Sequence, residues 1–437
     1  LSAFLLLGLM YVGYGLASPE DFNESPQLIA LLADYVQRLL PIGLLSGIEP
    51  EFVPVGQISL LVYQCVGPAF WIIALLCVWE CLRDRSMVND ASRHRVDAII
   101  PLGGESMSFM ATWEGNDYWF SATGRSAIAY RVSYGIALTV TGPFGDPNEY
   151  TEDLTDFATF CTQHSWTPVF YSVHEPQRAE LAKAGWDSLD VGTEMIVNPN
   201  EWQTRGKKWQ DVRTAINKAK RDGITDVLTT FKEAPFSVQT QIREISAQWA
   251  GKKALPEMGF TLGGVDELID SRVRLLYAVD GNGKVLGVTS WLPTYRDGTI
   301  IGWTLDFMRH RTDSVNGIME FLIARMAERL RDEGNVEFMS LSAAPLAGMG
   351  SNKGEHEESE VLRHALQMVA DIMEPAYGFH SLFRFKLKFH PDEEKVYICY
   401  PDAAKLPQIS LAVAQAYVPS LTPAEAMRFV RTIAPRD

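Results

Sequence analysis

Residues 302–350 contain the charged side chains with the clearest chemical potential in this sequence. Asp306 and Arg309 lie near the end of an apolar stretch that predicts a buried strand. A polar turn follows and leads into a helix. A charged pair at a strand end, opposite a helix N-terminus, is where α/β folds bind anionic or reacting groups. A structural ion pair is the alternative, because paired charges mark functional sites only in some cases.

The helix after this turn is predicted from the spacing of its apolar residues. Charged residues alternate with them, and Gly334 is a plausible helix end. A second strand follows and runs to Pro345. The apolar positions at helical spacing are Ile318, Phe321, Leu322, Ala324, Met326 and Leu330.

The same order of elements is expected twice in the chain. In residues 97–202 a helix at 149–164 follows strands expected at 109–113, 118–120, 127–132 and 136–141, and a strand at 167–172 comes after it. In residues 224–405 we expect a helix at 237–250, strands at 273–279, 284–293 and 300–308, the helix described above and a last strand at 395–400.

This order predicts an α/β (α+β) protein with tandem acetyltransferase-like (GNAT-type) domains. The first domain spans 97–202 and the second, catalytic one spans 224–405. A basic helix at 203–223 joins them, a membrane region at 1–96 precedes them and a tail at 406–437 follows. Such agreement in element order concerns the fold and says little about the substrate.

Residues 205–221 are basic in a chain that is acidic overall. They hold one acidic residue, Asp211, whereas the whole chain has a formal net charge of −15. Apolar residues recur on one stripe, so the basic side chains are expected to face solvent. This helix suits phosphate contacts with RNA, anionic lipid headgroups or both, with a merely solvated face as the alternative. The basic residues are Arg205, Lys207, Lys208, Arg213, Lys218, Lys220 and Arg221.

Two uncharged apolar stretches predict membrane spans. Residues 1–17 are just long enough to span, or form a signal-peptide core, and residues 52–79 are long enough to cross with a tilt. Residues 27–45 predict an amphipathic helix at the membrane surface. We expect a multi-pass protein of the cell membrane with cytoplasmic catalytic domains, because the second span is followed by Arg83, Arg85, Arg93 and Arg95.

The sequence indicates neither a metal nor a cofactor. The five cysteines show no CxxC or Cys/His spacing. Acetyltransferases bind the pyrophosphate of coenzyme A with a glycine-rich loop before the central helix. The loop at 309–317 has one glycine, and Asp313 takes a place where phosphates would lie. Coenzyme A is therefore not expected.

Four ordered motifs resemble the catalytic region of the multiple peptide resistance factor family, the phosphatidylglycerol lysyltransferases. The motifs are LDFMRH at 305–310, NGIMEFL at 316–322, APLAG at 344–348 and FKLKFHP at 385–391. Further matches lie at 166–171, 206–219 and 253–263, so the resemblance covers about residues 97–400. Members of this family transfer an amino acid from aminoacyl-tRNA to a lipid hydroxyl, often that of phosphatidylglycerol.

The resemblance implies roles for particular residues. Asp306 or Glu320 would bind the α-ammonium group of the substrate or relay a proton, and Arg309 would neutralise the terminal phosphate or the oxyanion. The aminoacyl ester is already activated, so no cofactor is implied and aminoacyl-tRNA itself is the donor. The basic helix would hold the acceptor arm of the tRNA. Substrate contacts are implied for Asn316, Gly317, Glu257, Lys386 and Lys388, and the two lysines would hold a phosphate unless they are solvated strand charges.

Other functions stay open at this point. The acceptor is phosphatidylglycerol, diacylglycerol or another lipid with a hydroxyl group, and the partners are then aminoacyl-tRNA, this lipid and the bilayer. Transfer to a peptidoglycan precursor is a second enzymatic possibility. A membrane-anchored module that binds lipid or RNA without turnover is the third, and it predicts an unchanged lipid profile after Asp306→Ala.

Overall fold

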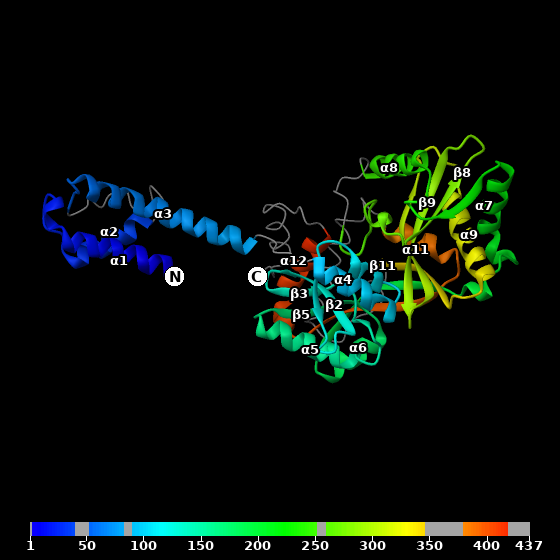
Figure 1. Ribbon diagram of the computed structural model, residues 1–437, viewed down its shortest axis with the longest axis horizontal. Helices are drawn as coiled ribbons and strands as arrows, with labels where there is room; N and C mark the ends of the chain where they lie inside the picture. The colour runs from blue at the N-terminus through cyan, green and yellow to red at the C-terminus, as the bar shows by residue number, and fades with distance from the viewer. Residues whose placement is uncertain (1, 40–51, 83–89, 251–258, 346–378, 418–437) are drawn as a thin grey trace, which may run out of the picture. The chain divides into compact units, whose positions relative to one another are not determined.

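The computed structural model describes residues 2–39, 52–82, 90–250, 259–345 and 379–417 (Figure 1). The chain divides into two compact units, residues 1–85 and residues 86–437. The described part of the first unit contains helices α1 (Ser2–Ala17), α2 (Leu28–Leu39) and α3 (Gln57–Leu82).

Helix α3 contains a segment, Gln57–Leu76, that is long and apolar enough to cross a bilayer by length and composition. The first predicted span forms α1, which has 16 residues and falls short of the about 20 residues that a spanning helix needs. In the described residues, therefore, one of the two predicted spans meets the criteria for a membrane helix.

Helix α2 packs against α1 and α3 through a buried polar cluster. The Tyr11 hydroxyl of α1 donates to the buried carboxylate of Asp34. Arg38 donates through Nε to the same carboxylate over 2.6 Å and through Nη1 to the Tyr63 carbonyl of α3 over 2.9 Å. These contacts tie the predicted surface helix to both of its neighbours.

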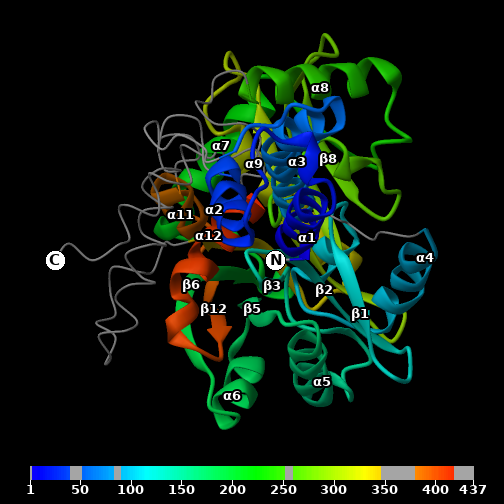
Figure 2. The ribbon, with the colours of Figure 1, turned by 90° about the vertical axis from the view of Figure 1, so that its left-hand side faces the viewer.

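Residues 86–437 are organised by a sheet of twelve strands in the described part of the chain (Figures 1 and 2). Its first part holds three antiparallel strands, β1 (Asp117–Phe120), β2 (Ser126–Ser133) and β3 (Ile136–Thr139), and the short β4 (Phe144–Gly145) beside β2. Helix α5 (Tyr150–Gln163) then crosses over to β5 (Thr167–Val173), which lies parallel to β3.

The second part repeats this order. Its antiparallel strands are β7 (Thr225–Thr229), β8 (Arg274–Val279), β9 (Val285–Arg296) and β10 (Thr299–His310). Helix α9 (Ile318–Glu333) crosses over to β11 (Phe338–Pro345), which lies parallel to β10. The predicted mixed α/β fold is confirmed by these two similar strand–helix–strand units.

The two parts exchange their last strands. Strand β6 (Asp187–Val197) pairs with β11 of the second part, and β12 (Asp392–Tyr400) pairs with β5 of the first. Because β12 and β6 also pair with each other, the strand order is β1-β2-β3-β5-β12-β6-β11-β10-β9-β8-β7. Residues 97–202 and 224–405 thus share one sheet, and the predicted domain boundaries stay predictions.

Helices cover both faces of the sheet. Leu276 and Ala278 of β8 point toward α9, while Leu275 and Tyr277 point toward α8 (Phe236–Ala250), as the alternation of side chains along a strand requires. Helix α7 (Gln210–Arg221) packs on the outside of α9 (Figure 1). Figure 2 shows α5 and α6 near β5 and β12. The remaining helices are α4 (Asp90–Ile99), α6 (Glu175–Lys183), α11 (Phe379–Leu387) and α12 (Leu406–Tyr417).

The strand predicted at 109–113 is wrong. Residues Ser108–Thr112 form a short 3-10 helix, in which the Met110 N–H donates to the Met107 carbonyl. Phe109 and Met110 are buried in the core. A short apolar run satisfies a buried strand and a buried helical turn equally well, so its pattern does not decide between them.

The core position of α9 predicts a large cost for removing one of its buried side chains. Leu322→Ala is expected to lower the free energy of unfolding by about 2–5 kcal/mol, because Leu322 is fully buried and a cavity would remain. Phe236→Ala is the control, since 83% of Phe236 is exposed and its loss should cost less than about 0.5 kcal/mol. Urea denaturation followed by tryptophan fluorescence measures both, and equal effects would contradict the packing described here.

Candidate active site

Strands β10 and β11 separate from each other in the second part of the sheet. They pair in parallel over three residue pairs, of which Thr304 with Ser340 is the last. Asp306 and Ser342 each follow this last pair by two residues, on strands that no longer pair with each other but still pair with β9 and β6. The carboxyl ends of parallel strands are where α/β sheets bind ligands. Asp306 therefore lies at the position in the fold that favours a ligand.

Asp306 is held by a backbone contact from the loop before β8. Its Oδ1 accepts the Gly263 N–H over 2.9 Å, while Oδ2 is buried and accepts no hydrogen bond from the described residues. Burial raises the pKa of Asp306 to about 7, against the opposing effects of the Gly263 N–H and Arg309. A carboxyl group with this pKa can take up and release a proton near neutral pH.

Arg309 lies against aromatic rings. Its guanidinium carbon is 3.5 Å from the centroid of the Trp249 ring and 4.8 Å from that of Phe307. Its Nη1 donates to the Met308 carbonyl over 3.0 Å. Stacking on Trp249 fixes the plane of the guanidinium, and the planar group suits recognition of a phosphate or an oxyanion. The sequence suggested an ion pair between Asp306 and Arg309 as the alternative to a functional site. In the structure Asp306 Oδ1 accepts the Gly263 N–H instead.

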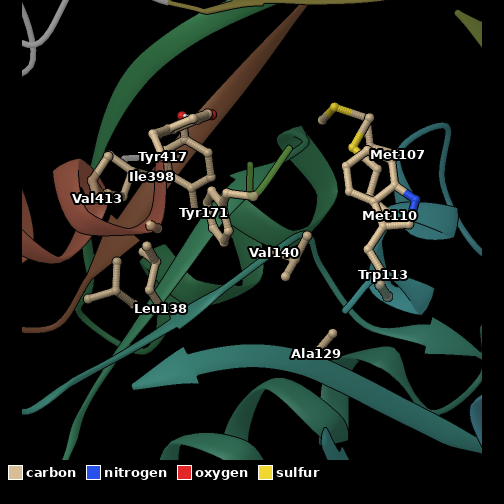
Figure 3. Close-up of a cluster of buried hydrophobic side chains, with 14 of the residues drawn as sticks. Met107, Met110, Trp113, Ala129, Leu138, Val140, Tyr171, Ile398, Val413 and Tyr417 are labelled. Atoms are coloured by element: carbon tan, nitrogen blue, oxygen red, sulfur yellow. Dashed lines mark hydrogen bonds between the residues drawn. The ribbon is translucent and has the colours of Figure 1, made fainter. Parts of the chain in front are cut away.

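A pocket that is open to solvent lies beside the Gly263 loop, because Thr261 and Leu262 are among its lining residues. The hydroxyls of Tyr171 and Tyr417, which Figure 3 labels, are 2.9 Å apart. The Oγ1 atom of Thr261 lies 2.7 Å from the Tyr417 hydroxyl. Thr261, two residues before Gly263, lines the pocket. Ser342 of β11 also lines it. The lining residues are Met107, Tyr171, Ser172, Val191, Thr261, Leu262, Ser342, Ala343, Val396 and Tyr417.

Lys386 lies next to the same pocket and is buried. Its Nζ donates to the carbonyls of Ser342 and Ala343 over 3.1 and 3.2 Å, and both of these residues line the pocket. Burial lowers the pKa of Lys386 to about 7, although the negative charge of Glu194 opposes this effect. Lys386 belongs to helix α11, so the alternative of a solvated strand charge is wrong for it.

Glu320 and Lys388 form an ion pair at the start of α9. Lys388 Nζ is 2.7 Å from Glu320 Oε1. The pairing explains how Glu320 is held in the first turn of the helix, where the helix dipole also favours a carboxylate. It also shows that these two predicted site residues contact each other, whereas they were expected to act on different substrate groups.

Of the other predicted substrate contacts, Asn316 and Gly317 are described, and neither lines the pocket. Asn316 is exposed. Gly317 has a φ of 94°, and a Cβ there would lie 2.9 Å from the Cβ of Ala215 in α7, so this glycine permits α7 and α9 to pack closely. Glu257 lies outside the described residues.

The basic helix has the predicted amphipathic form. Val212, Ala215 and Ala219 are buried on one face of α7. Arg213 donates through Nη1 to the carbonyls of Thr204 and Gly206, so it holds the preceding loop. Lys218 is half-buried. The predicted tRNA-binding residues that are exposed are Arg205, Lys207, Lys208, Lys220 and Arg221.

Several residues of the site were not found from the sequence. Tyr171 and Tyr417 meet only because strand exchange brings α12 next to β5, and no local pattern signals this contact. Gly263 follows Gly259 in a glycine-containing run that could have been examined as a close backbone approach. A Cβ on Gly263 would lie 2.0 Å from Asp306 Oδ2, so the position requires glycine.

The fold is a mixed α/β fold in which two similar strand–helix–strand parts share one sheet. Its ligand site lies where the two parallel strands of the second unit diverge. Residues 97–400 match the model of the family described as phosphatidylglycerol lysyltransferase, C-terminal. The chain belongs to this family, and the predicted resemblance is confirmed.

Relatives and solved structures agree with this assignment. The chain is 34% identical to an uncharacterized protein of Corynebacterium glutamicum over 92% of its own length and 50% of that protein. It is 26% identical to the lysylphosphatidylglycerol biosynthesis bifunctional protein LysX of Gordonia bronchialis over 79% of its length and 30% of that protein. The chain thus spans half or less of these relatives.

Two solved structures have the same fold. One is the C-terminal domain of a candidate lysylphosphatidylglycerol synthetase from Agrobacterium fabrum, with a TM-score of 0.65, 20% identity and coverage of 76% of this chain and 99% of that one. The other is L-PGS from Bacillus licheniformis, with a TM-score of 0.62, 22% identity and coverage of 74% and 94%.

The burial of Asp306 predicts how stability depends on pH. Its pKa is about 7 in the folded state and 3.8 for the free group, so ionisation favours the unfolded chain. As pH rises from about 4 to about 7, wild type should lose up to about 4 kcal/mol of stability relative to Asp306→Asn, with no further loss above pH about 8. Urea denaturation across this pH range measures the difference, and a constant difference would contradict the buried carboxyl group.

Proposed function

We propose that this protein transfers an amino acid from aminoacyl-tRNA to the hydroxyl group of a membrane lipid. The observation that carries the proposal is a pair of buried titratable groups in the region that matches the family. Asp306 accepts the N–H of Gly263, and Lys386 donates to two carbonyls of residues that line the pocket. Both groups have pKa values of about 7, so each can exchange a proton at neutral pH.

The reaction is an ester exchange. The lipid hydroxyl oxygen forms a bond to the ester carbonyl carbon, and the bond from that carbon to the tRNA ribose oxygen breaks. Asp306 takes the proton of the lipid hydroxyl and returns it to the ribose oxygen, so that no proton is gained or lost overall. The donor ester supplies the activation, and the proposal includes no cofactor.

Two positive groups, Lys386 and Arg309, stabilise the negative charge that develops on the carbonyl oxygen when the lipid hydroxyl attacks. Lys386 is placed by the Ser342 and Ala343 carbonyls, and Arg309 by its stack on Trp249. Preorganised charges of this kind need no rearrangement during the reaction, and this is the main source of their catalytic effect. Glu320, which Lys388 holds, is the candidate partner for the α-ammonium group of the amino acid.

The partners follow from the charged and apolar surfaces. The exposed basic residues of α7 and of the loop before it provide the phosphate contacts for the tRNA acceptor arm. The apolar segment Gln57–Leu76 anchors the chain in the bilayer, with further spans and a cytoplasmic site as parts of the same proposal. Lysine and phosphatidylglycerol are the first pair to test, because both words occur in the names of relatives.

Lipid mass spectrometry tests the function. Membranes with the purified protein are incubated with isotopically labelled aminoacyl-tRNAs, and the lipids are extracted. We expect one labelled aminoacyl lipid with wild type and at least a 100-fold loss with Asp306→Asn or Arg309→Ala, since removal of a positioned acid–base or charged group costs factors of about 10²–10⁴. Labelled peptidoglycan precursors in place of lipids would show that the acceptor is wrong.

The close approach of Gly263 to Asp306 predicts a second effect on activity. In Gly263→Ala the new methyl group would lie 2.0 Å from Asp306 Oδ2, so either the loop or the carboxyl group must move. We expect kcat to fall at least about 10-fold, because misplacing a catalytic group by about 1 Å costs that much or more. Gly281→Ala is the matched control, since no atom lies within 4 Å of its added Cβ.

The basic surface predicts an effect on tRNA binding alone. Replacing Lys207, Lys208, Lys220 and Arg221 by Ala should raise KM for aminoacyl-tRNA at least about 10-fold and flatten its salt dependence, because fewer phosphate contacts release fewer counterions. A variant of two other exposed lysines, Lys183→Ala with Lys405→Ala, should stay within about twofold of wild type. Equal effects of the two variants would contradict a specific tRNA surface.

A further inference from the structure

A histidine clamped between two carboxylates lies close to, but outside, the set of residues discussed so far. His174 Nδ1 is 2.7 Å from Glu105 Oε2, and Nε2 is 2.7 Å from Glu194 Oε2. Only 12% of the His174 side chain and 1% of the Glu194 side chain are exposed. When both carboxylates are ionised they can only accept, so both ring nitrogens must donate and His174 is then an imidazolium ion.

The charges around His174 favour this form. Burial by itself would lower the pKa of His174, but hydrogen bonds and charge from Glu105 and Glu194 outweigh it and hold the pKa well above its usual range. In the described residues the charged groups that face the ring are these two carboxylates, and Gln177 of α6 adds a neutral donor to Glu105 over 2.5 Å. The pKa of Glu194 is lowered, because contacts with His174 outweigh its burial.

The cluster connects to Lys386 through strand β11. The Ser340 hydroxyl donates to the second oxygen of Glu194, Oε1. The Ser342 N–H donates to the Ser340 Oγ over 2.9 Å, and the Ser342 carbonyl accepts from Lys386 Nζ over 3.1 Å. No proton can pass along the Ser342 backbone, so these contacts fix the position of the Ser342 carbonyl and, through it, of Lys386 Nζ. The same segment is irregular, with a φ of 66° at Ser342 and a register shift against β6 after Ser340.

The ionised Glu194 has two effects on the pocket. Its negative charge favours the charged form of Lys386, which burial disfavours. Its Oε1 also accepts the Ser340 hydroxyl, and this contact fixes the turn of β11 that presents the Ser342 and Ala343 carbonyls. A buried carboxylate without a cation would take up a proton and lose both effects.

We propose that His174 is a positioning residue for the aminoacyl transfer, which keeps Glu194 ionised and so holds the Lys386 ammonium group at the pocket. The inference rests on the proposed function for the reaction that Lys386 serves. It adds Glu105, His174 and Glu194 to the groups on which the transfer depends. None of these three contacts the substrate in this account, because they act through Ser340, Ser342 and Lys386.

Infrared spectroscopy tests the charge of Glu194 without relying on activity. Asp306 already contributes a band of a protonated carboxylic acid near neutral pH in wild type. In His174→Gln we expect this absorption to increase by the contribution of one further carboxylic acid, and the increase should be lost in His174→Gln with Glu194→Gln. No increase in His174→Gln would overturn the inference. If wild type transfers no amino acid with any aminoacyl-tRNA, the proposed function has failed, and the infrared result still shows whether His174 keeps Glu194 ionised.

Kinetics tests the consequence for the reaction. His174→Gln should lower kcat at least about 10-fold and leave KM for aminoacyl-tRNA within about twofold, because the tRNA surface is untouched. Glu175→Gln is the matched control, since this exposed neighbour pairs with Arg178 and should stay within about twofold in both constants.

An isosteric variant covers the case in which His174→Gln does not fold. Glu194→Gln keeps the shape of the side chain and removes its charge, so kcat should fall by a similar factor. A lower thermal midpoint with unchanged kcat in either variant would mean that the cluster only stabilises the fold, and would overturn the proposal.

Discussion

The site depends on the parting of two parallel strands within a sheet that is otherwise continuous. After Thr304 and Ser340, β10 and β11 no longer hydrogen-bond to each other, and the polar groups of their next residues need other partners. Asp306 accepts the Gly263 N–H, and the carbonyls of Ser342 and Ala343 accept the Lys386 ammonium group. Both charged residues are thereby held in buried positions, and burial brings both pKa values to about 7.

Strand exchange supplies the walls of the pocket. Because β6 pairs with β11 and β12 lies between β6 and β5, residues from both halves of the chain line the pocket. Val191 and Tyr171 come from the first half, and Val396 and Tyr417 from the C-terminal part. The same exchange places Glu194 of β6 next to Ser340 of β11. The pocket therefore needs both units of the repeated fold, and neither half contains it alone.

Local patterns in the sequence predicted the elements better than the contacts between them. The periodicity of α9, the alternation in the strands and the amphipathic α7 all follow from spacing, and Asp306 at its strand end was found in this way. The exchange of β6 and β12 was not predicted, because strand pairing depends on contacts between distant residues. Lys386 was expected to face a phosphate or solvent, since a lysine in a short motif gives no sign of burial. The 3-10 helix at 108–112 was missed because a short apolar run fits a buried strand and a buried helical turn equally well.

The most direct test of this account is a structure of the protein with a hydrolysis-resistant aminoacyl-adenosine amide, which represents the 3′ end of the donor. We predict that its carbonyl group lies in the pocket, within hydrogen-bonding distance of Lys386, and that the oxygen or nitrogen of the scissile bond lies near Asp306. Binding of the analogue elsewhere, in a protein that transfers amino acids to lipids, would contradict the assignment of the reaction to this pocket.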